Sequence, residues 1–208
     1  MFQKLQKFKK LALATALVAG VTAGTTGLVS GSAAASACGT RATFKAFAPW
    51  GDQNDYFVIP NGTFESGAGG WTMYAGNGSP SVVSDQAPWK INGSTHSRAL
   101  NLPAYSTAQA PNMCIASNED WLRLFYRDPG VSGSQLLVKV EAWSSAGRDS
   151  REFRINAGGA GWKLSPQIGL PNMRDAAGGQ MVTVTITSVG TAANWRVDDI
   201  MLDPWKTR

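Results

Sequence analysis

Apolar and polar residues alternate along much of the chain after residue 37, in short runs that Gly, Pro, Asn and Ser separate. The run "MVTVTITSV" (181–189) sets Val182, Val184 and Ile186 against threonines, and "QLLVKVEAW" (135–143) follows the same pattern. Such alternation places one face of a β-strand in a core and the other in water. Less regular runs of this kind are "DYFVI", "GWTMY", "PSVV", "RALNL", "WLRLFYR", "REFRIN" and "WRVDDIML".

Helical periodicity is hard to find after Cys38, whereas roughly eight to ten short strands at this spacing are typical of a β-sandwich. We therefore predict an all-β fold, an antiparallel β-sandwich of the jelly-roll kind. Asn-Gly pairs at 61–62, 77–78 and 92–93 favour tight turns between strands. Each pair precedes Thr or Ser and so also matches a glycosylation acceptor, but the turn is a sufficient explanation of the pair.

The first 37 residues are predicted to be a signal peptide. Four lysines precede a stretch of small apolar residues, and "AAASA" places alanines where a signal peptidase reads them. A membrane span is the rival interpretation, which the small residues and the cleavage pattern disfavour. We therefore expect cleavage before Cys38, a secreted extracellular protein and no membrane span in the mature chain. A lipoprotein anchor at Cys38 is a further alternative, although Ala35 stands where such signals usually carry Leu or Val.

Removal of this leader changes the charge of the chain. The sequence has 19 Lys and Arg and 14 Asp and Glu, and four of the lysines lie in the leader. The mature part therefore has a net charge of +1, and no basic stripe remains to predict nucleic-acid binding. Its length fits one domain, which we expect to be monomeric. The expected order is an extended lead-in over 38–55, tied down by a disulfide, and the sandwich over 56–208.

Cys38 and Cys114 are the two cysteines of the chain. An exported protein folds in an oxidising compartment, so one disulfide between them is the simplest expectation. Two unpaired thiols are the alternative, and two cysteines are too few for a structural zinc site.

Catalytic patterns are weak in this sequence. The single histidine, His96, lies in the polar run "NGSTHSR", and no G-x-S-x-G motif accompanies it, so we interpret it as a polar loop residue. Adjacent acids on a strand face opposite ways, which disfavours an acid–base pair at 119–120 or 198–199. Glu141 and Glu152 could meet across a hairpin, where nearby arginines would neutralise them. The sequence therefore favours a protein that is not an enzyme.

Tryptophans are the candidate ligand-binding residues, because aromatic rings stack on the apolar C–H faces of sugars. Most of the eight are expected in the core of the sandwich. Trp89 in "APWKING", Trp143 at the end of its strand and Trp162 in "GAGWKL" are those that we expect to be exposed. Packing in the core or at its rim is the alternative for each of them, and the simpler one.

Asp198 and Asp199 lie inside the apolar run of the last predicted strand, where carboxylates are costly unless they are paired or bound to a metal. A jelly roll commonly brings its first and last strands together, which would place Glu65, in "GTFE", beside them. Calcium suits such a cluster, since it takes carboxylate and carbonyl oxygens. A salt bridge to Arg196 or another cation is the alternative.

The runs "NGTFESGAGGW" and "WRVDDIMLDP" resemble the signature ends of galactose-binding-like jelly rolls, among them carbohydrate-binding modules of the family 4/9 type. This resemblance implies a structural calcium held by Glu65 and by Asp198 or Asp199, with backbone oxygens around Asn61 and Gly62. The mature chain as a whole resembles small secreted actinobacterial proteins of unknown function. The shared runs include "FVIPNGTFESGAGGW", "HSRALNLP", "APNMCIA" and "LRLFYR". That family has no settled activity to carry over.

The function expected from these features is that of a secreted, non-catalytic jelly-roll module that binds carbohydrate at or near the cell envelope. A structural or protein-interaction module with no glycan ligand is the main alternative. An extracellular polysaccharide hydrolase or lyase is the weaker one, because no catalytic set is visible.

Overall fold

The computed structural model describes residues 38–85, 87–88, 91 and 96–204, all of which fall in one compact unit. The predicted signal peptide, Trp89 and the Asn-Gly pair at 92–93 lie outside the described residues. In the part that the structure describes, no helix has the length and hydropathy needed to cross a membrane.

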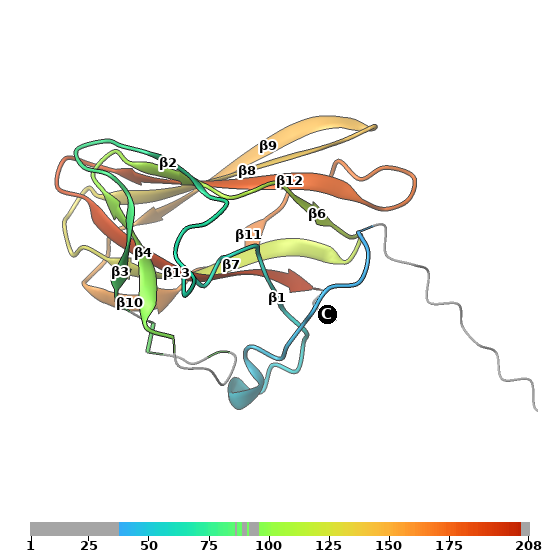
Figure 1. Ribbon diagram of the computed structural model, residues 1–208, viewed down its shortest axis with the longest axis horizontal. Coiled ribbons are helices and arrows are strands. Elements are labelled where there is room, and N and C mark those ends of the chain that lie inside the picture. The colour runs from blue at the N-terminus through green and yellow to red at the C-terminus, as the bar shows by residue number, and fades with distance from the viewer. Residues whose placement is uncertain (1–37, 86, 89–90, 92–95, 205–208) are drawn as a thin grey trace, which may run out of the picture. The chain divides into compact units, whose positions relative to one another are not determined.

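Two antiparallel sheets lie face to face in the structure (Figure 1). One has the strand order β10 (Gly161–Leu164), β7 (Glu119–Asp128), β13 (Asn194–Pro204), β4 (Arg98–Pro103) and β3 (Ser81–Ser84). In the same sheet, β1 (Phe57–Val58) pairs with β13, and β11 (Ile168–Gly169) pairs with β7. This seven-stranded layer is the lower one in Figure 1.

The second sheet has six strands. Its order is β2 (Thr72–Tyr74), β5 (Thr107–Gln109), β12 (Gln180–Val189), β8 (Gln135–Ser144) and β9 (Gly147–Asn156), and β6 (Met113–Ile115) also pairs with β12. The two strands with the clearest alternation, β12 and β8, are direct neighbours, with Val184 opposite Val140. Both of these valines are fully buried between the sheets. The predicted β-sandwich of the jelly-roll kind is confirmed.

The first and last strands are adjacent, as the sequence predicted. Phe57 of β1 is paired with Leu202 of β13. Beyond this pair, the N–H of Ile59 donates to the carbonyl of Ile200 at 3.0 Å, and the N–H of Ile200 donates to the carbonyl of Gly62 at 3.1 Å. The "GTFE" turn therefore lies against the middle of β13, where the two aspartates are.

The lead-in over 38–55 is more folded than the extended segment that we expected. Phe44 forms a bridge with Tyr56, and a 3₁₀ turn, η1, spans Ala48–Trp50. Phe47 is buried in a second hydrophobic cluster, with Tyr56, Phe125 and Met201, on the outer side of the seven-stranded sheet. The lead-in bends because its apolar side chains can be buried there.

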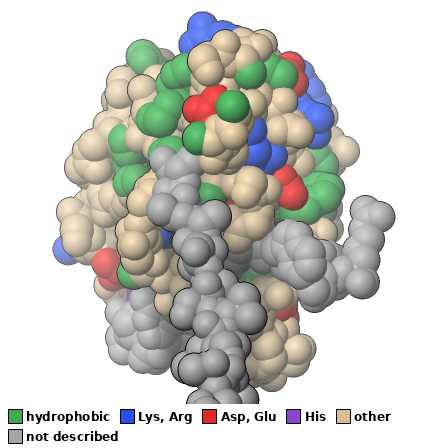
Figure 2. Space-filling model, turned by 90° about the vertical axis from the view of Figure 1, so that its right-hand side faces the viewer, with side chains coloured by type: hydrophobic (Ala, Val, Ile, Leu, Met, Phe, Trp, Pro, Cys, Tyr) green, Lys and Arg blue, Asp and Glu red, His purple; other side chains and the backbone are tan. Residues whose placement is uncertain are grey.

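Cys38 and Cys114 form the predicted disulfide, with their Cα atoms 5.4 Å apart. In this bonded state the Cys38 sulfur is not available for the thioether of a lipid anchor. The side of the molecule that Figure 2 presents carries basic and acidic side chains interspersed, in keeping with the small net charge of residues 38–208.

Candidate functional site

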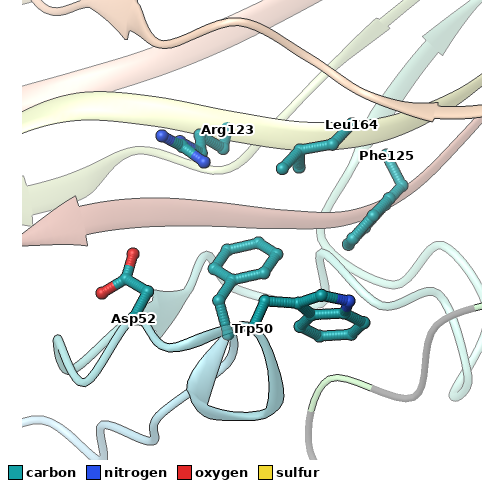
Figure 3. A pocket seen from close by; sticks show the side chains of 6 residues that line it. Trp50, Asp52, Arg123, Phe125 and Leu164 are labelled. Atoms are coloured by element: carbon teal, nitrogen blue, oxygen red, sulfur yellow. The ribbon is translucent and has the colours of Figure 1, made fainter.

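A hollow of about 350 Å³ lies on the outer face of the seven-stranded sheet, where the lead-in crosses β7 and β10 (Figure 3). It is lined by Phe47, Trp50, Asp52, Arg123, Phe125 and Leu164. Because side chains alternate along β7, Leu122 and Leu124 fill the core between the sheets while Arg123 and Phe125 face outward into the hollow.

Trp50 is held at the rim of the hollow by a tight local structure. The turn η1 has proline in its first positions and is closed by Gly51 in the left-handed conformation, with φ of 86°. Because the turn is only three residues long, it covers little of the indole. Its side chain is 55% exposed, the largest exposed fraction among the large hydrophobic residues that the structure describes. Figure 3 shows the ring below Phe125 and Leu164.

The floor of the hollow is aromatic. The Phe47 ring lies 6.0 Å from that of Trp50 and 6.1 Å from that of Phe125, centroid to centroid. The Phe47 ring also makes an edge-on contact with Tyr56, at 4.9 Å. Buried Phe47 and Tyr56 therefore fix the base on which the exposed indole stands.

One side of the hollow is polar. Oδ2 of Asp52 accepts a hydrogen bond of 2.6 Å from the Tyr56 hydroxyl, and Oδ1 accepts one of 2.9 Å from the N–H of Asn54. Burial raises the pKa of Asp52, but these hydrogen bonds and the Arg123 charge outweigh it and hold the pKa below its ordinary value. Nε of Arg123 lies 3.3 Å from Oδ2 of Asp203. The hollow thus places an ionised carboxylate and a guanidinium beside an exposed indole.

The predicted ligand-binding tryptophans lie elsewhere. Trp162, on β10, is half-buried, and its Nε1–H donates to Asp85 at 3.3 Å. Trp143, on β8 of the other sheet, is also half-buried, with the Arg148 guanidinium 5.6 Å from its ring centre. The two do not form a common platform, and Trp89 is outside the described residues. Trp50 escaped the sequence analysis, although its "PWG" context signals a tight turn that exposes the middle residue.

Two of the three acid pairs considered for catalysis lie close to lysine or arginine side chains. Glu141 lies 3.3 Å from Lys139, and Glu152 lies 3.8 Å from Arg154. An arginine thus neutralises Glu152 as expected, whereas Glu141 is paired with a lysine. At 119–120, the carboxylates of Glu119 and Asp120 are paired with Arg41 and Arg174, respectively.

Glu65 anchors the start of β4. Phe64 is fully buried, with φ of 56°, and the Glu65 side chain leaves the core. Oε1 of Glu65 accepts hydrogen bonds of 2.9 Å from the backbone N–H groups of Ser97 and Arg98, and Oε2 accepts one of 3.2 Å from the Ser97 hydroxyl. Burial raises the pKa of Glu65, but these bonds and the His96 charge bring it below its ordinary value.

Loss of the Glu65 carboxylate is expected to destabilise the fold in a pH-dependent way. Glu65→Gln should lower the free energy of unfolding by about 1–2 kcal/mol near neutral pH, because it removes charge-assisted hydrogen bonds. The unfolded chain, with the higher pKa, takes up the proton first, so this stabilisation is complete above the ordinary pKa and is lost as the pH falls through the lowered one. Urea unfolding of both proteins at pH 7 and at pH 3 measures it. An equal difference at both pH values would contradict the expectation.

Asp198 and Asp199 are fully buried and face His96, which is 5% exposed. The interpretation of His96 as a polar loop residue is therefore wrong, because the start of β4 packs it against β13. Nδ1 of His96 lies 2.9 Å from Oδ1 of Asp199. The predicted alternative is a salt bridge to Arg196 or another cation; Arg196 faces Asp85 at 3.7 Å, and the ionisable group beside Asp199 is His96.

Burial dominates the electrostatics of these aspartates. Desolvation, together with the neighbouring Asp199 charge, raises the pKa of Asp198 to about 8. Burial also raises the pKa of Asp199, while the Asp199 carboxylate raises the pKa of His96. Oδ1 of Asp198 accepts a hydrogen bond of 2.8 Å from the N–H of Asp199, and Oδ2 accepts a long one of 3.4 Å from Ala87.

The carboxylates here would supply only part of the six to eight oxygen ligands that calcium takes. Both oxygens of Glu65 are engaged by Ser97 and Arg98. The third side chain that reaches Asp198 and Asp199 is the His96 imidazole, which offers nitrogen. The structure therefore groups the two aspartates as predicted, but with His96 in place of Glu65.

No protein-family model matches this sequence, and no curated protein matches it. The similar solved structures include the enzymatically active domain of tailspike protein 4 of bacteriophage CBA120, with a TM-score of 0.50, 13% identity, and coverage of 71% of this chain and 21% of that one. A family 61 carbohydrate-binding module in complex with β-1,4-galactotriose has a TM-score of 0.46 at 21% identity, covering 71% of this chain and 98% of that one.

The C-terminal family 22 carbohydrate-binding module of Clostridium thermocellum Xyn10B has a TM-score of 0.45 at 15% identity, covering 73% of this chain and 95% of that one. At these identities the likeness concerns the fold. The chain is thus a β-sandwich similar in its strand arrangement to the tailspike domain, of which it spans about a fifth.

Proposed function

We propose that this protein is a secreted, non-catalytic module that binds carbohydrate at or near the cell envelope, and that the hollow beside Trp50 holds the sugar. The observation that carries the proposal is the Trp50 indole, 55% exposed at the rim of a hollow that also presents a carboxylate and a guanidinium. The predicted leader and the resemblance of the two chain ends to carbohydrate-binding jelly rolls support the same assignment.

The chemistry of the hollow suits a neutral sugar ring. A pyranose or furanose has apolar C–H faces and a rim of hydroxyl groups, so it needs an aromatic surface and polar groups beside it. Trp50 offers the surface, while Asp52 accepts and Arg123 donates hydrogen bonds. The two opposite charges add no net charge, and the volume of about 350 Å³ is in the range of small-molecule sites.

The residues that line the hollow favour binding of a sugar without catalysis. Hydrolysis of a glycosidic bond usually uses two carboxyl groups on either side of the scissile bond. Asp52 is the one carboxylate among the six lining residues. Its lowered pKa makes it a poor general acid at neutral pH. His96, the usual kind of general base, is buried against Asp199 instead.

The proposal predicts that Trp50→Ala abolishes glycan binding while the fold persists. Protein secreted from the full chain would be screened on an array of plant, fungal and bacterial wall glycans, and the best ligand titrated by calorimetry. Loss of the stacking surface should weaken affinity by about 30-fold or more, as expected for a central aromatic contact. Because Trp50 is exposed, the midpoint of thermal unfolding should change little.

Tyr74 provides a matched control. It is 52% exposed on β2, in the other sheet, so Tyr74→Ala removes a comparable aromatic surface away from the hollow. Affinity should be unchanged in this variant. If Tyr74→Ala loses binding and Trp50→Ala retains it, the sugar site is on the six-stranded sheet. If the wild-type protein binds no glycan on the array, the structural or protein-interaction module would be favoured instead.

A further inference from the structure

We propose that His96, Asp198 and Asp199 bind a divalent transition metal ion, with Zn²⁺ as the best-suited candidate, at the junction of the first and last strands. Each residue can offer one ligand atom, and these atoms all lie within 4.8 Å of one another. The inference concerns a site apart from the hollow at Trp50, and it does not depend on carbohydrate binding.

The local backbone explains how two adjacent aspartates come to face one point. Side chains of successive strand residues normally point to opposite faces. In β13 the register against β7 shifts between Asp198 and Met201, and Asp199 has φ of 45°. This bulge interrupts the alternation, so that both carboxylates approach His96 at the start of β4.

The polar atoms of the cluster are poorly satisfied by protein groups. Asp199 is fully buried, yet neither of its oxygens has an aligned hydrogen-bond donor in the described part of the chain. The same holds for Nδ1 of His96, although it lies only 2.9 Å from Oδ1 of Asp199. Buried polar atoms are almost always paired, so convergent unpaired ones indicate a missing partner.

Charge balance favours a divalent ion as that partner. When both buried carboxylates are ionised they carry two negative charges, of which a protonated His96 would neutralise one. A buried charge without compensation is strongly unfavourable. A divalent cation bound by two carboxylates and a neutral imidazole leaves the site uncharged, and it would be an electrophilic partner for both Asp199 oxygens.

The kinds of ligand atom decide between metals. Calcium is held by oxygen ligands, whereas mixed imidazole and carboxylate ligands suit Zn²⁺ and its neighbours in the first transition series. The oxygens of Glu65, which would complete an oxygen site, accept hydrogen bonds from Ser97 and Arg98 instead. Three protein ligands and one water would satisfy four-coordinate zinc.

The test uses untagged protein secreted from the full chain and stripped with a chelator. Thermal unfolding would be followed with ZnSO₄, with CaCl₂ and without metal, and bound metal counted by elemental analysis. We expect about one Zn²⁺ per chain. At free zinc of about 100 times the dissociation constant the melting temperature should rise by roughly 5–10 °C, because the unfolded chain does not assemble the site. Calcium should have little effect.

Two variants make the assignment specific. His96 is the single histidine of the chain, so His96→Gln should abolish the zinc-induced shift. Glu65→Gln should retain it, whereas a calcium site of the kind expected from the sequence would lose its ion. Where His96→Gln fails to fold, Co²⁺ added to the wild-type protein should give the visible absorption of a tetrahedral nitrogen–oxygen site.

Two results would overturn the proposal. A shift with calcium that disappears in Glu65→Gln would assign the site to calcium. No bound metal and no shift with any ion would leave a His96–Asp199 ion pair beside a protonated Asp198.

Discussion

Replacement of Cys38 and Cys114 by serine is expected to lower the free energy of unfolding by about 4–5 kcal/mol. The disulfide joins residues 76 positions apart, so it removes much of the conformational freedom of the unfolded chain. In the native state, by contrast, the lead-in keeps other contacts. Arg41 is paired with Glu119 and donates to the carbonyl of residue 114, and Phe44 bridges to Tyr56.

Urea unfolding measures this effect. The double serine variant should unfold at a lower urea midpoint with a similar or larger slope, since its unfolded state is free to expand. A reducing agent should destabilise the wild-type protein to the same extent and leave the variant unaffected, which serves as the control. Equal midpoints for the two proteins under oxidising conditions would show that the bond contributes nothing to stability.

More of the fold than of the site could be predicted from the sequence, because the alternation of apolar and polar residues along a strand is a local signal. A strand such as 181–189 shows in its own residues which side is buried, and that is enough to imply two packed sheets. Strands of two residues, such as β1 and β11, carry no such pattern. They exist because longer neighbours, β13 and β7, offer free hydrogen-bonding edges.

The site depends on contacts between distant parts of the chain, which local pattern does not reveal. Asp198 and Asp199 were recognisable because carboxylates in an apolar strand need a partner. That partner, His96, stands among small polar residues that look like a solvated loop, and its burial follows only from the packing of β4 against β13. Trp50 is exposed because a lead-in with apolar residues folds over β7, which its own composition does not specify.

Truncation of Phe64 should harm the sandwich core directly. It is fully buried between the sheets, and its ring centre lies 5.1 Å from that of Trp71. Its backbone has φ of 56°, a conformation that non-glycine residues seldom adopt. The turn therefore holds Phe64 in an uncommon conformation in order to bury its ring, while Glu65 points away to the start of β4.

Phe64→Ala is thus expected to lower the free energy of unfolding by about 3–5 kcal/mol, the combined cost of lost burial and of a cavity beside Trp71. Phe64→Leu, which fills part of that cavity, should lose distinctly less. Phe64→Gly distinguishes the contribution of the ring from that of the backbone conformation. Glycine adopts positive φ freely, so this variant should recover the part of the loss in Phe64→Ala that comes from strain in the turn. Urea unfolding of the four proteins measures these differences. If Phe64→Ala unfolds within about 1 kcal/mol of the wild-type protein, the turn rather than the ring closes the sandwich.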